Sequence, residues 1–276
     1  MVATPILPLF FMLLVSELVP PPSLQRWLLA ILINSGLGAI AWVAPKKLLT
    51  RAGYLHAWVL GLLIWGTLGW RGYLVVMVYF LVGSAVTRVG LAQKEAAGIA
   101  EQRGGARGPE NVWGSAFAGS LCALGVVVCL LLLPTVPAAT SLALLLQLGY
   151  VASFSTKLAD TCASEIGKAY GQRTFLITTL QPVARGTEGA ISLEGTLAGV
   201  VASAAIALAG WWAGLISLIG VGVCMIAAFI ATNLESLIGA TLQTRFSWLT
   251  NEWVNVINTL TGAIVAILIG LLLRAA

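Results

Sequence analysis

The stretch Lys157-Leu-Ala-Asp160-Thr-Cys-Ala-Ser-Glu165-Ile-Gly-Lys168 places charged and hydroxyl side chains inside a sequence that is otherwise strongly apolar. It contains the only aspartate of the chain. A charged side chain surrounded by hydrocarbon is costly and, where it occurs, usually serves function. The place of this stretch among the apolar segments therefore decides how the rest of the chain is interpreted.

The surrounding composition is that of a membrane protein. Of the 276 residues, 59% are hydrophobic and 9% are charged, and the mean hydropathy is +0.97. Soluble domains carry about 25% charged residues, because a globule must cover its surface. Continuous apolar runs favour membrane-spanning helices over the alternating strands of a β-barrel. The predicted fold class is therefore all-α, a polytopic transmembrane helical bundle that forms a single domain.

Runs long enough to cross a bilayer, about 20 apolar residues each, define the candidate spans. We expect about nine spans, within a range of seven to nine. They are 3–19, 23–44, 53–70, 72–91, 112–133, 138–160, 190–209, 212–231 and 254–273. Proline falls between these segments, at Pro45, Pro134 and Pro137, where a break in helix is expected.

The basic residues test this count. With nine spans, the connections on one side of the membrane contain only Arg26, Arg71 and Arg274, and the other basic residues outside the spans lie on the opposite side. Basic residues collect on the cytoplasmic side of membrane proteins. This predicts a cytoplasmic N-terminus and places the two long polar loops, 92–111 and 161–189, in the cytoplasm, where any chemistry is expected.

Several features exclude other classes. The net charge of +5 reports membrane orientation and not nucleic-acid binding. The four cysteines and His56 show no metal-ligand spacing, and a disulfide framework is not expected. Segment 3–19 lacks a basic leading region, so we interpret it as a span and not as a cleaved signal peptide. No transit peptide is visible, which favours a bacterial origin.

Helical geometry gives the stretch 157–168 a single polar face. Counted at 100° per residue, its polar side chains fall within an arc of about 140°, provided that the helix continues to the end of the stretch. These side chains are Lys157, Asp160, Thr161, Ser164, Glu165 and Lys168. The two carboxylates could hold Mg²⁺, with the lysines facing phosphate groups. The alternative is an internal Lys157–Asp160 salt bridge, which leaves the hydroxyl groups and Glu165 unexplained.

A basic, glycine-rich loop precedes the span at 112–133. In Arg103-Gly-Gly-Ala-Arg107-Gly-Pro-Glu110-Asn111, two arginines stand just before a helix start. Arginine binds phosphate with two parallel hydrogen bonds, and a helix N-terminus favours anions. Arg103, Arg107 and Asn111 are therefore candidate substrate-binding residues. The alternative is a solvated basic loop that only fixes topology.

A second glycine-rich loop leads into the span at 190–209. It offers backbone donors, hydroxyl groups, one arginine and carboxylates, which together suit an anion or a metal-bound phosphate. The candidates are Arg185, Gly186, Thr187, Glu188, Gly189 and Ser192. The loop does not match the Walker pattern. Gly195 and Gly199 have the small-xxx-small spacing that indicates helix packing.

Further polar residues follow. Glu235 lies in a polar patch at 232–243, and Asn251, Asn255 and Asn258 recur on one face of the last span. These amides could bind helices together or orient ligands, and their spacing does not distinguish between these two roles. All the polar groups lie on the predicted cytoplasmic side, which indicates one shared cavity open to both water and lipid.

Three spaced motifs carry a family resemblance. They are Asp160-Thr-Cys-Ala-Ser-Glu165-Ile-Gly, Thr178-Thr-x-x-Pro182-Val-x-x-Gly186-Thr-x-Gly189-x-x-Ser192-x-x-Gly195-Thr-x-Ala-Gly199 and Glu235-Ser-x-x-Gly239-Ala-Thr-x-Gln243. In this order they resemble a domain-of-unknown-function integral-membrane family that includes phytyl-phosphate kinase of tocopherol and phylloquinone biosynthesis. The resemblance covers 85–266, whereas 1–84 is less characteristic. Glu188 and Glu235 depart from the family pattern but keep its polarity.

The resemblance implies transfer of a phosphoryl group from a nucleoside triphosphate, CTP or another, to phytyl phosphate. The implied partners are a lipid-like prenyl phosphate, the nucleotide, Mg²⁺ and membrane lipids, with no nucleic acid and no indicated oligomer. The implied location is a cyanobacterial inner or thylakoid membrane. In this hypothesis the metal ligands are Asp160, Glu165, Glu188 and Glu235, the catalytic groups are Asp160, Lys157, Lys168 and Arg185, and Ser164 and Asn255 join the substrate-binding set.

Phosphoryl transfer suits these residues on chemical grounds as well, since it needs positive charge and alignment more than covalent work by the protein. Two other functions remain open. A membrane lipid cytidylyltransferase would make a CDP-lipid and release pyrophosphate. A transporter of a phosphorylated solute would be expected to show matching broken helices in both halves, whereas the polarity here is concentrated after residue 85.

Overall fold

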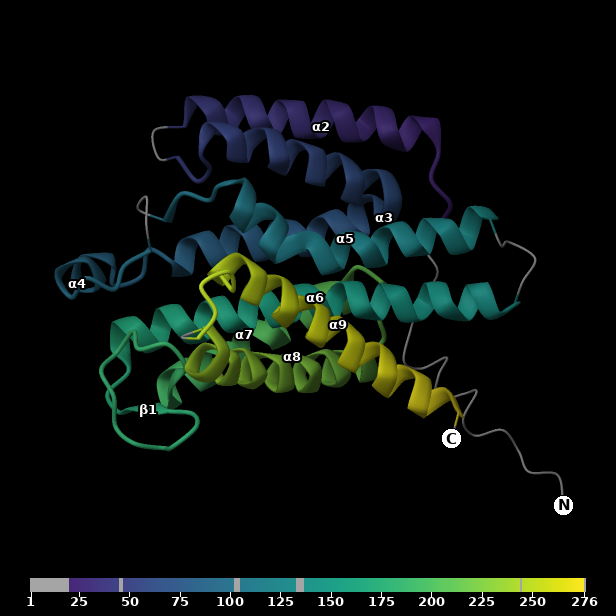
Figure 1. Cartoon of the computed structure of the whole chain (residues 1–276). Coiled ribbons are helices and arrows are strands. Elements are labelled where there is room, and N and C mark those ends of the chain that lie inside the picture. Colours follow the sequence, from purple (N-terminus) through teal and green to yellow (C-terminus); the bar gives the residue numbers. More distant parts are fainter. Residues whose placement is uncertain (1–19, 45–46, 102–104, 133–136, 244, 276) are drawn as a thin grey trace, which may run out of the picture.

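The structure is a computed structural model that describes residues 20–44, 47–101, 105–132, 137–243 and 245–275. Figure 1 shows a bundle of long helices whose connections gather at its two ends. The elements are α2 (Leu24–Val43), α3 (Arg51–Val86), α4 (Leu91–Ala96), α5 (Pro109–Leu132), α6 (Pro137–Tyr170), β1 (Thr174–Leu176), β2 (Ala190–Ser192), α7 (Leu193–Trp212), α8 (Leu218–Ile238), the π-helical turn η2 (Gly239–Gln243) and α9 (Asn251–Ala275).

The predicted all-α membrane bundle is confirmed. Within the described residues, seven helices are long and apolar enough to cross a membrane, namely α2, α3, α5, α6, α7, α8 continued by η2, and α9. The predicted span 3–19 lies outside the described residues. The two predicted spans at 53–70 and 72–91 correspond to one element, α3, whose shape explains the difference.

Helix α3 folds back on itself at Gly69. This residue has φ 67° and ψ −158°, a conformation outside the helical region that glycine adopts readily. The parts of α3 before and after Gly69, its two arms, both reach Arg107. Gly53 packs against the Arg107 carbonyl, and a Cβ added at Gly83 would lie 2.9 Å from the Arg107 guanidinium. In a straight helix these glycines would be about 45 Å apart. The two arms are therefore antiparallel and match the two predicted spans.

Contacts at the two ends of the bundle follow the predicted alternation of spans. At one end, Arg26 of α2 donates to the Thr67 carbonyl at 3.1 Å, and the rings of Trp70 and Trp212 lie 6.2 Å apart. At the other end, α4 and the β1 segment lie together, to the left in Figure 1. The helices thus run alternately between the two ends, and the cytoplasmic location of the α4 end remains a prediction.

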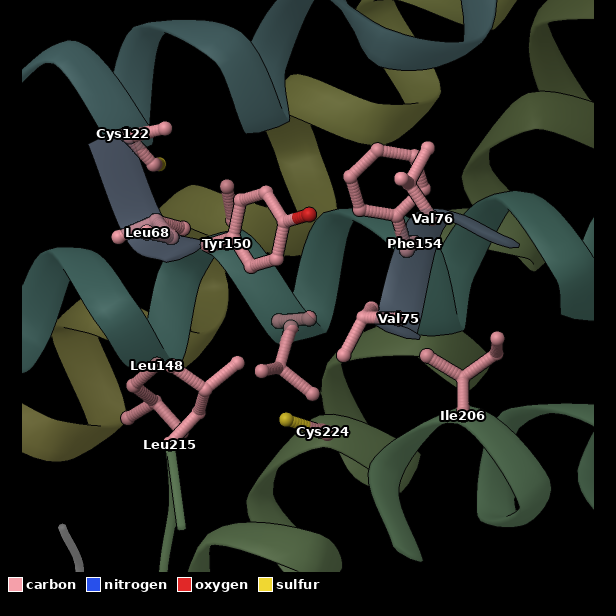
Figure 2. Close-up of a cluster of buried hydrophobic side chains, with 14 of the residues drawn as sticks. Leu68, Val75, Val76, Cys122, Leu148, Tyr150, Phe154, Ile206, Leu215 and Cys224 are labelled. Atoms are coloured by element: carbon pink, nitrogen blue, oxygen red, sulfur yellow. The ribbon is translucent and has the colours of Figure 1, made fainter. Parts of the chain in front are cut away.

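Helix α6 lies at the centre and packs against α3, α5, α7, α8 and α9. Its apolar middle forms the core with residues of α3, α7 and α8, as Figure 2 shows around Tyr150 and Phe154. The Tyr150 hydroxyl, fully buried, donates to the Gly72 carbonyl at 2.7 Å. A buried hydroxyl needs such a partner in an apolar interior. This bond ties α6 to the returning arm of α3.

The predicted loop at 161–189 is partly structured. Residues 161–170 continue α6 as a helix to Tyr170, which is the condition for the single polar face of the stretch 157–168. Residues 174–176 and 190–192 then form a small antiparallel hairpin, with Phe175 opposite Ile191. The helix continues because its polar residues face a cavity and not lipid, so the change in composition at residue 160 does not end it.

The close packing of α7 on α6 depends on Gly195 and Gly199, as their spacing indicated. A Cβ added at Gly195 would lie 2.5 Å from the Ala163 carbonyl oxygen, and one at Gly199 would lie 3.1 Å from that of Ala159. Small residues let membrane helices approach closely, because no hydrophobic effect drives helices together inside lipid. These two glycines therefore fix the spacing of the two helices.

The Gly195→Ala variant should unfold more easily, by about 1–3 kcal/mol, because the new methyl group meets backbone that cannot move aside. Gly222→Ala on α8 is the matched control, since nothing lies within 4 Å of its added Cβ. That control should be neutral or slightly stabilised, because alanine favours helix over glycine. The measurement is the unfolding midpoint of each purified variant in detergent. Equal midpoints for the two variants would contradict this account.

Candidate functional site

A polar cavity of about 240 Å³ lies at the α4 end of the bundle. Its walls come from the second half of α6, the loop at 186–189, β2 and the facing parts of α7, α8 and α9. Its charged lining residues are Glu101, Lys157, Asp160, Glu165, Lys168, Glu188 and Glu235. This cavity combines residues that are up to about 150 positions apart in sequence, from Glu101 to Asn255.

The polar face of α6 forms one wall. Because α6 remains helical to Tyr170, all six of its polar side chains point to the same side, as the 100° spacing predicts. Each of them lines the cavity: Lys157, Asp160, Thr161, Ser164, Glu165 and Lys168. The stretch 157–168 therefore forms a continuous wall of the candidate site.

Lys157 is held by two partners. Its ammonium group lies 2.5 Å from the Asp160 carboxylate, in an i,i+3 pair whose side chains are 8% and 13% exposed. It also donates to the side-chain oxygen of Asn255. The internal salt bridge that we considered as an alternative is therefore formed. It does not exclude a functional role, because both groups face the cavity.

A second carboxyl group approaches the first. The carboxyl groups of Asp160 and Glu235 lie within hydrogen-bonding reach of each other, and Glu188 is near enough to act on Glu235 electrostatically. Two carboxylates at such a distance repel each other unless a proton or a cation lies between them. The three acidic side chains therefore form a place where positive charge is favoured.

Amide side chains of α9 complete this part of the site. Asn258 donates to the carboxylate of Glu235, while Asn255 accepts from Lys157. Nearby, Gln243 of η2 donates to the side-chain oxygen of Asn251. The asparagine stripe therefore faces the charged groups of α6 and α8. These hydrogen bonds join α9 to α6 and α8, so the stripe binds helices together, and the groups that it holds, Lys157 and Glu235, line the cavity.

Glu165, which was predicted to bind Mg²⁺, forms an ion pair with a lysine. Its carboxylate forms an ion pair with Lys94 of α4, which is completely buried and also donates to the Thr87 carbonyl at 2.8 Å. Lys94 falls in the predicted loop 92–111, where a basic residue indicates only membrane orientation. Its pairing with a residue 71 positions away depends on how α4 packs, and no local pattern indicates it. Glu165 lines the cavity, but its charge is already neutralised.

The loop at 186–189 covers the cavity next to α8. Gly186 and Gly189 have φ values of 81° and 76°, which glycine adopts without strain. A Cβ added at Gly189 would lie 2.6 Å from the Ser236 carbonyl oxygen, so the loop backbone touches α8 directly. Gly186, Thr187, Glu188 and Gly189 all line the cavity, and anion binding by this loop stays a prediction. Ser192 also lines it, and its hydroxyl oxygen caps α7 by accepting from Gly195.

Three predicted residues lie outside the cavity lining. Arg107 stacks on the Tyr79 ring at 5.2 Å and donates to its hydroxyl. Asn111 accepts from the Gly108 N–H at the start of α5. Arg185 donates to the Ala169 carbonyl at the end of α6, where a cation offsets the helix dipole. These contacts stabilise loops and helix ends. Arg103 lies outside the described residues.

The donor atoms of the cavity suit a hard cation. In the described part of the chain, no group of three or more His, Cys, Asp or Glu side chains is arranged to hold a metal by itself. Asp160 and Glu235 supply paired carboxyl groups, and the Thr232 hydroxyl is buried there without a described hydrogen-bond partner. Mg²⁺ binds through one or two carboxylates together with substrate phosphates. The residues present therefore fit Mg²⁺ that arrives with a phosphate ligand.

The cysteines and His56 lie outside the cavity lining. All four cysteines are free and buried. The His56 ring accepts a hydrogen bond from the Trp113 indole at 2.8 Å, away from the cavity lining. The site therefore consists of carboxylates, amides, hydroxyls and lysines.

Fold and site together define a polytopic α-helical membrane protein with a charged cavity at one end of the bundle. The family model described as "Integral membrane protein DUF92" matches residues 34–263. The chain therefore belongs to the DUF92 family of integral membrane proteins, and the membership predicted from the three motifs is confirmed.

Relatives occur in three kinds of organism. The chain is 64% identical to an uncharacterized membrane protein of Synechocystis sp. over 87% of this chain and 90% of that protein. It is 49% identical to the protein VTE6, chloroplastic, of Arabidopsis thaliana over 80% of this chain and 65% of that protein. It is 32% identical to an uncharacterized membrane protein of Methanocaldococcus jannaschii over 90% of this chain and 95% of that protein. No solved structure matches the chain.

Proposed function

We propose that this protein is a prenyl-phosphate kinase that transfers a phosphoryl group from a nucleoside triphosphate, CTP or another, to phytyl phosphate. The product is phytyl diphosphate, formed in tocopherol and isoprenoid salvage. The observation that carries the proposal is the pair of close carboxyl groups, Asp160 and Glu235, beside Lys157 in a cavity at one end of a membrane bundle. Similarity to a chloroplastic plant protein and to a cyanobacterial membrane protein supports it.

The reaction requires charge neutralisation and alignment. An oxygen of the acceptor phosphate forms a bond to the γ-phosphorus, and the bond from that phosphorus to the bridging oxygen breaks, so the nucleoside diphosphate leaves. The acceptor oxygen is already ionised at neutral pH, so no base has to remove a proton. This agrees with a cavity lining that contains no histidine among the described residues.

Each wall of the cavity then has a role. Asp160 and Glu235 would hold Mg²⁺, and the bound ion would neutralise charge on the transferred phosphoryl group, while Glu188 adds negative charge near Glu235. Lys157 and Lys168 neutralise phosphate oxygens from the α6 wall. The loop at 186–189 contacts a phosphate, while Asn255 and Asn258 orient Lys157 and Glu235. Glu165, Arg107 and Arg185 act through the surrounding structure, because their partners are protein groups.

The charged end of the bundle is proposed to face the cytoplasm, where nucleotides are found. The excess of basic residues at this end supports that orientation. Within a cyanobacterial cell, both the inner and the thylakoid membrane satisfy it.

A labelling assay tests the function. Purified protein in lipid vesicles receives phytyl phosphate, Mg²⁺ and CTP labelled either at the γ- or at the α-phosphate. A kinase moves only the γ-label into phytyl diphosphate, whereas a cytidylyltransferase moves the α-label into a CDP-lipid and releases pyrophosphate. Uptake of phytyl phosphate into vesicles without chemical change indicates a transporter. The absence of labelled phytyl diphosphate with CTP, ATP, GTP and UTP alike would overturn the proposal.

A further inference from the structure

The cavity extends from its charged end along the seam between α7 and α8. These helices follow each other through a short turn and run antiparallel, so residues near the start of α7 lie opposite residues near the end of α8. From the charged end inward, the lining residues of α7 include Thr196, Val200 and Ser203, and those of α8 include Ser236, Thr232 and Phe229. The start of α7 at Leu193 and the innermost residue, Ser203, are about 15 Å apart along the helix.

The lining is charged on one side of this path and apolar on the other. At the level where Gly199 packs against the Ala159 carbonyl, α6 contributes Lys157 and Asp160, whereas α7 contributes Val200. The path does not cross the bundle. Below Ser203 the seam is closed, because Ile206 and Cys224 are completely buried. An occupant that enters at the charged end therefore cannot continue toward the opposite side.

The side of the path between α7 and α8 is formed by partly exposed side chains. Val200 is 37% exposed and Phe229 is 51% exposed within the described part of the chain, although both also line the cavity. Both lie in helices that are long and apolar enough to cross the membrane. The outer surface of such a helix faces lipid, so these two side chains mark an edge at which the cavity and the lipid come close.

We propose that the hydrocarbon chain of the substrate leaves the cavity between α7 and α8 and passes Val200, Ser203 and Phe229 into the bilayer. This inference rests on the proposed function, since it places a prenyl chain behind a phosphate held near Asp160 and Lys157. The cavity of about 240 Å³ is smaller than pockets that enclose a whole ligand, about 300–1,000 Å³. A long chain therefore has to extend beyond it, and the lateral opening is where its apolar atoms meet lipid.

Blocking the opening should affect long substrates selectively. The Val200→Trp variant should raise KM for phytyl phosphate by about tenfold, the loss expected when roughly two methylene groups leave apolar contact. Its kcat/KM for a short prenyl phosphate, dimethylallyl phosphate, should stay within about twofold of wild type. Val201→Trp is the matched control, because Val201 is 69% exposed and does not line the cavity; it should behave as wild type with both substrates.

A second measurement does not depend on turnover. Because the four native cysteines are buried, a Val200→Cys variant can be labelled with a bilayer-soluble maleimide, and phytyl phosphate should slow this labelling while dimethylallyl phosphate should not. Labelling of Val201→Cys should be unaffected. Lack of protection at position 200, or equal kinetic effects of the two tryptophan variants, overturns the lateral path. Failure of wild type to phosphorylate either substrate, with position 200 protected, rejects the kinase reaction and leaves the path supported.

Discussion

The Asp160→Asn variant should lose phosphoryl-transfer activity by about 10²–10³-fold, the usual cost of removing one group that stabilises charge in the transition state. Asp160 pairs with Lys157 and lies within hydrogen-bonding reach of Glu235. Its replacement removes a carboxylate from the proposed cation site while the amide keeps the same shape. The measurement is kcat for γ-label transfer to phytyl phosphate over a range of Mg²⁺ concentrations.

Two further variants separate chemistry from folding. Asp160→Asn leaves buried Lys157 without its carboxylate, which by itself could lower the yield of folded protein. The double variant Lys157→Met/Asp160→Asn carries no unpaired charge at this pair, and should recover the unfolding midpoint without recovering activity. Glu95→Gln is the matched control, since Glu95 is exposed on α4 and away from the cavity lining. Wild-type turnover in Asp160→Asn would remove Asp160 from the mechanism.

The Lys94→Met variant should lower the free energy of unfolding by about 3–5 kcal/mol, because it leaves the Glu165 carboxylate buried without its partner. The Lys94→Met/Glu165→Leu variant should recover most of this loss, since replacing both members of a buried ion pair by apolar residues is often neutral or stabilising. Lys47→Met, at an exposed lysine, should change stability by no more than about 0.5 kcal/mol. Unfolding midpoints in detergent provide the comparison.

The same double variant decides the role of Glu165. If this residue only anchors α4 to α6, the Lys94→Met/Glu165→Leu protein should keep phosphoryl-transfer activity within a fewfold of wild type. A loss of activity as large as that expected for Asp160→Asn, in a protein with normal stability, would return Glu165 to the set of metal ligands. A loss of stability in Lys94→Met equal to that of Lys47→Met would contradict the anchoring role itself.

The sequence predicted the features that depend on neighbours along the chain. Apolar runs located the spans, and the helical repeat placed Lys157, Asp160 and Glu165 on one face that lines the cavity. The small-xxx-small spacing correctly identified the packing of Gly195 against Ala163. Each of these signals spans only a few residues, because it arises from the geometry of a single helix.

The sequence could not predict contacts set by the packing of distant elements. Lys94 and Glu165 meet because α4 docks on the end of α6, and Asn258 reaches Glu235 because α8 and α9 lie side by side. Arg107 has the chemistry of a phosphate ligand, but its position between the two arms of α3 gives it a protein partner in Tyr79. A local motif identifies what a side chain can bind, whereas the fold determines what lies within its reach.

The contacts of α9 also have a consequence for biosynthesis. Lys157 and Glu235 are translated before Asn255 and Asn258, the amides that bind them in the finished bundle. A nascent chain that stops before residue 251 therefore lacks both amides, although Lys157 can already pair with Asp160. The hydrogen bonding of these buried charges is completed only when α9 has been synthesised and has docked against α6 and α8.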